Sequence, residues 1–299
     1  MNSVPATARP ADDLSPDLGR CLADDRRIGL LALRALHEEL VCYPKPGLVS
    51  RLDAGSHSDM DAATFLRSIC ALRNYFPAIA AAGAAHASLT HLRMLGMEAE
   101  QRMLRATGGV NTHRGAIFNL GLLAAAAGWQ RANAHGRTGQ SLGETVRRQW
   151  GEAIAWCAAA NHDAPLSHGA CVAQRYGSGG ARAEAAAGFP FVFEIGLPAF
   201  RLSLARHGDR GRAAVQCFFS LMAHLPDTNL LYRGGLQGLA RAQAAAHEFL
   251  RHGGAEGGEW QARARAIHHE FIVCRLSPGG SADLLAATLF VHALQREHV

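Results

Sequence analysis

The sequence lacks long apolar runs, paired cysteines and a leader segment. Its 299 residues contain no run of roughly 18 apolar residues, the length that a membrane-spanning helix needs. The seven cysteines include no C-x-x-C pair, so we expect reduced thiols rather than a disulfide framework or a four-cysteine zinc site. The first 25 residues have no apolar signal core. These absences predict a cytoplasmic protein without a membrane span.

Aromatic residues and lysine are also scarce. Aromatics make up 7% of the chain, and the basic residues are dispersed rather than gathered in a stripe with stacking side chains, so we expect no nucleic-acid partner. The net charge is +5, and Lys45 is the only lysine among 30 basic residues, a bias typical of arginine-rich codon usage. Lys45 lies between Pro44 and Pro46, which stiffen the backbone. A compact cation on a rigid segment suits a phosphate ligand, although a plain connector is an equally simple interpretation.

Alanine is abundant and β-branched residues are sparse, which favours helices over strands. Apolar residues recur at helical spacing. The predicted helices cover 25–42, 61–83, 90–106, 114–128, 141–160, 181–188, 211–225, 236–252, 259–274 and 281–296. Glycine pairs such as Gly234-Gly235 mark helix ends. We therefore predict an all-α fold with a flexible tail over residues 1–25 and one compact catalytic domain over 26–299.

Five polar, glycine-marked segments interrupt the predicted helices. They cover residues 39–60, 100–115, 167–190, 227–235 and 276–284. In the second segment, Asn111 and Thr112 suit helix capping as well as function, whereas His113 and Arg114 have no capping role. Asp227 follows an apolar helix and has no evident structural role, which makes it the best single metal-ligand candidate.

Two other groups are better explained by structure. Asp283 would stabilise the start of its own helix by about 0.3–1 kcal/mol. The cluster His268-His269-Glu270 resembles a metal site, but neighbouring helical residues point about 100° apart. We therefore predict that this cluster lies on the surface.

Taken together, the segments resemble the triphosphoribosyl-dephospho-coenzyme A synthases, from about Glu39 to Leu289. The resemblance rests on PKPGLV at 44–49, the pattern of Gly55, His57, Asp59 and Met60, GGVNTHRG at 108–115, DTN…RGG at 227–235 and LSPGGSADLLA at 276–286. The chain departs from the family pattern at Ser50, where an acid is frequent, and at Ser56, where alanine is usual. Five short motifs in one order make the resemblance specific.

The resemblance implies an all-α, Mg²⁺-dependent transferase with ATP and 3'-dephospho-coenzyme A as substrates. The acceptor's ribose 2'-hydroxyl takes a triphosphoribosyl group from ATP, adenine leaves, and the α-linked product implies inversion. Two branches of the family serve citrate lyase or malonate decarboxylase. Arg114 in NTHR, and the SHGAC…RYG…GFP stretch over 167–190, are similar to the malonate branch. The partners would then be enzymes of the malonate decarboxylase acyl-carrier pathway.

On this basis each candidate residue has a predicted role. The candidate catalytic carboxylates are Glu39, Asp59 and Glu100. The candidate Mg²⁺ ligands are Asp227, Asp53 and Glu100. The candidate substrate-binding residues are Lys45, Arg51, His57, Asn111, His113, Arg114, Arg182, Arg233, Ser277 and Ser281. The arginines and Lys45 would hold phosphates, and one carboxylate, not identified by sequence, would deprotonate the hydroxyl.

Three alternatives stay open at this point. The same reaction could serve citrate lyase, or a metal-dependent nucleotide or ADP-ribose hydrolase could use water as the acceptor. A non-catalytic chaperone or carrier-protein partner is the third, and it would not need buried acids and bases together. The sequence does not decide the oligomeric state, and a homodimer is compatible with it.

Overall fold

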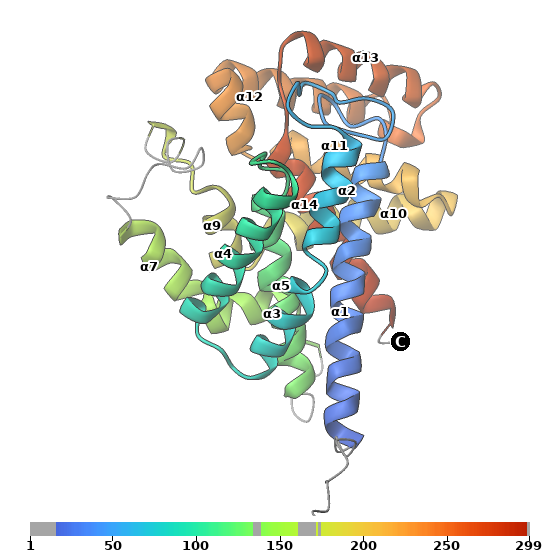
Figure 1. Cartoon of the computed structure of the whole chain (residues 1–299). Coiled ribbons are helices and arrows are strands. Elements are labelled where there is room, and N and C mark those ends of the chain that lie inside the picture. Colours follow the sequence, from blue (N-terminus) through green and yellow to red (C-terminus); the bar gives the residue numbers. More distant parts are fainter. Residues whose placement is uncertain (1–15, 134–138, 161–171, 173–174, 298–299) are drawn as a thin grey trace, which may run out of the picture.

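The computed structural model describes residues 16–133, 139–160, 172 and 175–297, and within these ranges it contains helices and no strand. The predicted all-α class is confirmed (Figure 1). The α-helices are α1 (Pro16–Val41), α2 (Ala62–Ala71), α3 (Tyr75–Ala84), α4 (Leu89–Ala106), α5 (Arg114–Ala132), α6 (Leu142–Val146), α7 (Glu152–Ala160), α9 (Gly180–Ala186), α10 (Leu197–His207), α11 (Arg210–His224), α12 (Thr228–Arg251), α13 (Trp260–Val273) and α14 (Gly279–Glu297). Short π-helical turns lie at Arg147–Gly151 and Phe191–Gly196, and a 3-10 turn lies at Gly254–Glu256.

The helices differ from the sequence prediction at several points. The range predicted over 141–160 is interrupted by a π-helical turn, and the helix predicted from 236 begins at Thr228. Helix α1 begins at Pro16 rather than near residue 25. The helix expected over 61–83 is two helices, α2 and α3. Pro77 lies in the first turn of α3, where proline is tolerated, but its ring would clash with the preceding turn of one continuous helix. Helix α10 was missed because Pro190 and Pro198 indicate chain breaks, yet each lies at a helix start, where proline is tolerated.

Helix α5 occupies the centre of the molecule and is buried from Ala116 to Trp129 apart from Phe118. It packs closely on α3, because small residues let the two backbones approach. A side chain at Gly83 would collide with the carbonyl of Ala125, and one at Gly128 would collide with the carbonyl of Ala80. The two backbones are therefore in direct contact at these positions.

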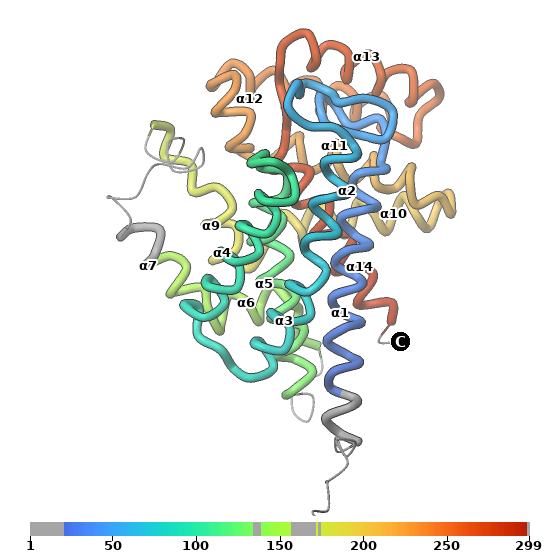
Figure 2. The backbone as a smooth tube through the Cα atoms, in the orientation of Figure 1, coloured from blue at the N-terminus to red at the C-terminus, as the bar shows by residue number. Residues whose placement is uncertain are grey.

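The first and last helices lie along each other. Helix α1 packs against α14, and the C-terminal end of the chain lies beside α1 (Figure 1). Arg27 Nε and Glu297 Oε2 form an ion pair at 2.5 Å near that end. At the opposite end, the loop between α1 and α2 lies under α13, as the tube in Figure 2 shows.

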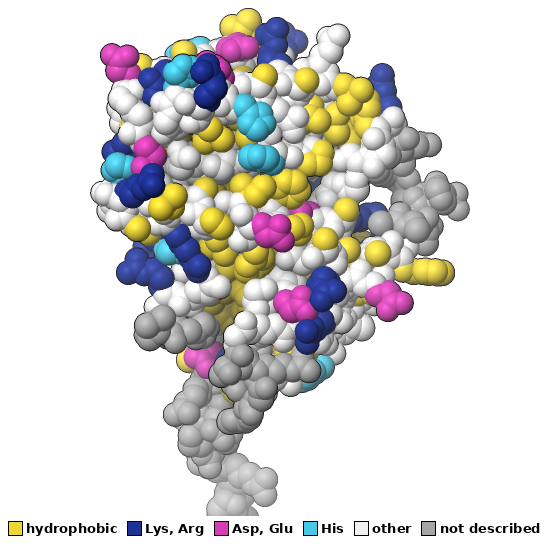
Figure 3. Space-filling view, turned by 180° about the vertical axis from the view of Figure 1, so that it is seen from behind, with side chains coloured by type: hydrophobic (Ala, Val, Ile, Leu, Met, Phe, Trp, Pro, Cys, Tyr) yellow, Lys and Arg dark blue, Asp and Glu magenta, His cyan; other side chains and the backbone are white. Residues whose placement is uncertain are grey.

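The surface carries mixed charges. On the face in Figure 3, basic side chains are interspersed with acidic ones. In the parts of the chain that the structure describes, no single helix is both long and apolar enough to cross a membrane. The ranges Gly180–Ala186 and Phe191–His207 reach that length and composition only as a pair, and they are bent by 80°.

Candidate active site

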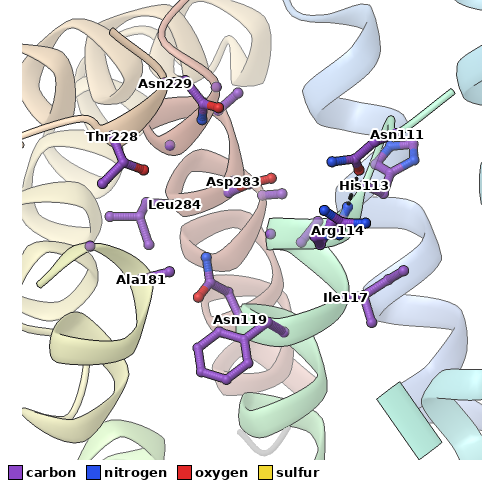
Figure 4. A pocket seen from close by; sticks show the side chains of 18 of the residues that line it. Asn111, His113, Arg114, Ile117, Asn119, Ala181, Thr228, Asn229, Asp283 and Leu284 are labelled. Carbon is purple, nitrogen blue, oxygen red and sulfur yellow. Dashed lines mark hydrogen bonds between the residues drawn. The ribbon is translucent and has the colours of Figure 1, made fainter. Parts of the chain in front are cut away.

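A cavity of about 1950 Å³ opens where α1, α5, α9, α12 and α14 meet. Segments far apart in the sequence converge on it, and Figure 4 shows part of its wall. The predicted site residues that line it are Glu39, His57, Asp59, Glu100, Asn111, His113, Arg114, Arg182, Asp227, Arg233 and Ser277. Lys45, Arg51, Asp53 and Ser281 do not line it. The polar segments, although far apart in the sequence, therefore contribute side chains to one site.

Lys45 makes a buried ion pair behind the cavity wall. Its Nζ donates to the backbone carbonyl of Glu39 at 2.6 Å and also contacts Glu39 Oε1. Only 1% of Lys45 is exposed, so the ammonium lies behind Glu39 rather than in the cavity. The predicted phosphate contact of Lys45 is replaced by this pair, and Arg51 is exposed to solvent away from the cavity.

Asp53 and His268 fasten the loop that follows Lys45. His268 Nε2 lies 3.1 Å from both carboxylate oxygens of Asp53, and its Nδ1 lies 2.9 Å from the carbonyl of Lys45. His268 is completely buried, so the predicted surface location is wrong for this residue. The helical pattern did not reveal that the 43–60 loop folds over this face of α13.

Asp227 is fully occupied by hydrogen bonds at the junction of two helices. Its Oδ1 accepts from the amide of Asn229 at 2.9 Å, which caps α12. Its Oδ2 accepts from the amide of Ser281 at 2.8 Å and from Ser281 Oγ at 3.0 Å, at the start of α14. The prediction that Asp227 has no structural role is therefore wrong, because its carboxylate joins α12 to α14.

The predicted metal ligands do not form one site. Asp227 binds backbone amides, Asp53 pairs with His268, and Glu100 pairs with Arg114. Among the described residues, no group of three or more His, Cys, Asp or Glu side chains is placed to hold a metal ion. The side chains present therefore do not fit a resident Mg²⁺ held by the protein alone.

Arg114 lies on the cavity wall at the start of α5. Its Nε donates to Glu100 Oε1 at 2.6 Å, and its amide donates to Asn111 Oδ1 at 3.1 Å (Figure 4, dashed line). Asn111 therefore has the capping role that the sequence allowed. The Arg114 side chain is 45% exposed, so its guanidinium is free to turn toward an anion in the cavity.

Arg233, His57 and Ser277 form a polar cluster on another wall. Arg233 Nη2 lies 3.2 Å from His57 Nδ1, and His57 Nε2 lies 2.9 Å from Ser277 Oγ. Burial and the nearby Arg233 lower the pKa of His57, so the imidazole is neutral at physiological pH. A neutral imidazole leaves Arg233 as the cation of this cluster.

Several buried polar atoms on the cavity wall have no hydrogen-bond partner among the residues that the structure describes. They are Thr112 Oγ1, His113 Nε2 and Asn119 Oδ1. His113 Nδ1 is engaged with Ser68 Oγ at 2.6 Å, and burial lowers the pKa of His113 to about 3, so the ring is neutral. Because buried polar atoms are normally hydrogen-bonded, these atoms indicate that a polar ligand fills the cavity. The sequence prediction missed Asn119 because it lies inside an apolar helix.

Two further carboxylates on the wall were not predicted as site residues. Burial raises the pKa of Glu184 to about 7, although its Oε1 accepts from the amide of Phe191 at 2.8 Å. Burial and the charges of Glu39 and Asp227 raise the pKa of Asp283 well above its usual range. Asp283 was interpreted as an ordinary helix-start residue because its partners come from distant segments.

The fold and the cavity define a class of protein: a helical enzyme that acts on large anionic substrates. The cavity exceeds the roughly 300–1,000 Å³ of an ordinary ligand pocket, and its wall combines arginines with buried carboxylates. The model of the ATP:dephospho-CoA triphosphoribosyl transferase family matches residues 25–299. The chain belongs to this family, and it is a transferase. A non-catalytic role is thereby set aside.

Relatives with assigned names match the chain over nearly its whole length. A probable 2-(5''-triphosphoribosyl)-3'-dephosphocoenzyme-A synthase of Acinetobacter calcoaceticus is 41% identical, covering 91% of this chain and 92% of its own length. The synthase of that name from Pectobacterium atrosepticum is 38% identical, covering 97% and 98%. A further probable synthase from Salmonella choleraesuis is 42% identical, covering 88% and 89%. No solved structure matches the chain.

Proposed function

We propose that the protein joins the triphosphoribosyl group of ATP to the ribose 2'-hydroxyl of 3'-dephospho-coenzyme A and releases adenine. The observation that carries this proposal is the convergence of the predicted motifs on one large cavity. The names of the relatives describe the same product. A cavity of about 1950 Å³ has room for two nucleotide substrates side by side.

The arginines on the cavity wall are suited to the triphosphate. Arg114, Arg182 and Arg233 lie on different elements around the same space. A guanidinium binds phosphate oxygens through two parallel hydrogen bonds, which holds the triphosphate and fixes its orientation. Arg114 would exchange part of its contact with Glu100 for the phosphate. Direct displacement would invert the anomeric carbon, as the family resemblance implies.

Magnesium fits this reaction as an ion that is bound to ATP. Mg²⁺ keeps several waters and is usually held by substrate phosphates with one or two carboxylates, so it does not need a cage of protein ligands. Asp59 lies on the cavity wall and is 60% exposed, which leaves it open to a hydrated ion. We therefore propose that Mg²⁺ enters bound to the triphosphate.

For the pathway, we propose malonate decarboxylase rather than citrate lyase. The support is Arg114 in the NTHR motif, together with Arg175, Tyr176 and the Gly188-Phe-Pro190 stretch. Ser167 to Cys171, the other part of this signature, lies outside the described residues. Because both pathways use the same product, the pathway rests on these motifs alone. A homodimer and a cytoplasmic location stay predictions.

Mass spectrometry of the product tests the reaction. The protein is incubated with ATP, 3'-dephospho-coenzyme A and Mg²⁺, and we expect free adenine and the coupled product in equal amounts. Leaving out Mg²⁺ should abolish both. Adenine released without 3'-dephospho-coenzyme A would favour the hydrolase alternative, and neither product from the complete mixture would refute the proposal.

A further inference from the structure

We infer that Asp283 is the general base that takes the proton from the acceptor hydroxyl. This inference rests on the proposed function and assigns the one role that the sequence left open. It differs from the predicted candidates Glu39, Asp59 and Glu100, and it follows from what each carboxylate on the cavity wall already binds.

The other buried acids on the wall are held by strong partners. Glu39 pairs with the buried ammonium of Lys45. Asp227 accepts hydrogen bonds from the first turns of two helices. Glu184 accepts from the amide of Phe191 at 2.8 Å. The oxygens that face these partners are already engaged, so they are not available to a substrate hydroxyl.

The two more exposed acids are also unsuited. Glu100 is paired with Arg114, so its Oε1 is already engaged by the guanidinium. Asp59 is 60% exposed and lies 3.7 Å from His57, so water competes for it.

Asp283 lines the cavity, forms no ion pair among the described residues, and accepts fewer hydrogen bonds than Asp227 or Glu184. Within the described part of the chain, it accepts a hydrogen bond from the backbone amide of Ala116, at the start of α5. Gly115 permits this approach, because a side chain there would collide with the Asp283 carboxylate. The family motif glycine next to Arg114 thus makes room for Asp283, which lines the cavity.

The surroundings of Asp283 indicate that a ligand reaches it. In the view of Figure 4, Asp283 lies above Asn119, and Arg114 lies to its right. Asn119 is 2% exposed and its Oδ1 has no partner, and the same holds for Nε2 of His113, which is 3% exposed. Asn119 and His113 line the same cavity as Asp283, and their unpaired atoms are suited to the sugar hydroxyls and bases of nucleotides. Burial near Glu39 and Asp227 raises the pKa of Asp283, which makes it a stronger base.

The proposed step is balanced as follows. The 2'-oxygen of 3'-dephospho-coenzyme A forms a bond to C1' of the ATP ribose, and its proton moves to Asp283. The C1'–N9 bond breaks, and its electron pair stays on adenine. Adenine takes a proton from solvent, and Asp283 returns its proton to solvent after the product leaves. No oxidant or further reactant is needed.

The test is Asp283→Asn, with Asp209→Asn as the matched control. Asn keeps the size and the acceptor oxygen for the Ala116 amide, but it cannot take the proton. Asp209 caps α11 at the surface and does not line the cavity, so its variant should behave like wild type. We expect kcat for Asp283→Asn to fall by about 10²- to 10⁴-fold, with the KM for ATP within about threefold.

Stability provides a readout that a structural role would not give. The raised pKa of Asp283 means that the folded state disfavours the ionised carboxylate. The charge therefore lowers the stability of the protein as pH rises above the pKa of this carboxyl in the unfolded chain. Removing the charge should raise the Tm at pH 8, while Asp209→Asn should leave it unchanged. A purely structural Asp283 would instead lower the Tm when replaced.

The outcomes separate the two proposals. Wild-type protein that forms no coupled product would refute the proposed function. If wild type is active and Asp283→Asn keeps its kcat within tenfold, only the inference fails. A lower Tm for Asp283→Asn would likewise overturn it, because the carboxylate would then stabilise the fold.

Discussion

The ion pairs Glu39–Lys45 and Glu100–Arg114 join predicted site residues, but they differ in burial. The side chains of Lys45 and Glu39 are 0% and 7% exposed, and those of Arg114 and Glu100 are 45% and 28% exposed. A buried pair is rigid, because breaking it leaves an uncompensated charge in the interior. An exposed pair is worth little and is easily exchanged. The first pair therefore holds the wall of the cavity, and the second is available to the substrate.

The largest effect is expected for Lys45→Met, which tests whether the buried pair stabilises the fold. The variant leaves the buried carboxylate of Glu39 without a cation, so we expect the free energy of unfolding to fall by about 3–5 kcal/mol. Urea denaturation followed by circular dichroism measures this loss. The double variant Lys45→Met/Glu39→Gln should regain most of the stability, and equal loss in both variants would show that packing rather than charge is responsible.

A smaller effect is expected at Glu184, a buried carboxylate with no ion pair among the described residues. Its pKa of about 7 lies above the usual value of 4.5, so the unfolded state holds fewer protons between these two values. Stability should therefore fall as pH rises through that window, by about 2 kcal/mol between pH 5 and 8.

Glu184→Gln should remove this dependence, because glutamine does not ionise and still accepts from the amide of Phe191. Urea midpoints measured at pH 5 and pH 8 give the slope for each protein. Glu98→Gln, on the exposed face of α4, should keep the slope of wild type. Parallel slopes for wild type and Glu184→Gln would mean that Glu184 is ionised throughout.

The smallest effect on stability is expected from Arg114→Ala, which should lower the free energy of unfolding by no more than about 1 kcal/mol. Its effect should appear in binding instead. Loss of a charged hydrogen-bond partner predicts a rise of about 10- to 100-fold in the KM for ATP. Arg102→Ala removes an exposed pair on α4 away from the cavity and is the control. An unchanged KM would remove Arg114 from the phosphate site.

Local pattern predicted most helices but not every break. Asp61 marks the start of α2, where its side chain accepts from the amide of Thr64. The predicted break at Gly235 is confirmed, because this residue has a non-helical backbone with φ 62° and α12 is kinked there. Helix α10 was missed because Pro198 suits a helix start as well as a break. Capping and periodicity are local properties. They predict a helix boundary only where the residue type is compatible with a single backbone conformation.

The site was predicted as a set of motifs, and its internal contacts were not. The glycine-marked segments do surround one cavity, as their order and chemistry suggested. The partners of Asp227 at Ser281, and of Asp53 at His268, lie more than 50 and 200 positions away along the chain. The sequence shows that a carboxylate is present, but only the fold shows whether it caps a helix, contacts a histidine or has no partner.

The pairing of α1 with α14 has a consequence for synthesis of the chain. The inner face of α1 stays without its partner until the chain has run from Val41 to Gly279 and on through the last helix. The same helix that completes the core also brings Asp283 to Gly115. Because such distant contacts form late, the nascent chain on the ribosome exposes apolar surface for most of its synthesis. Shortening α14 should therefore lower soluble yield before it changes any property of the folded enzyme.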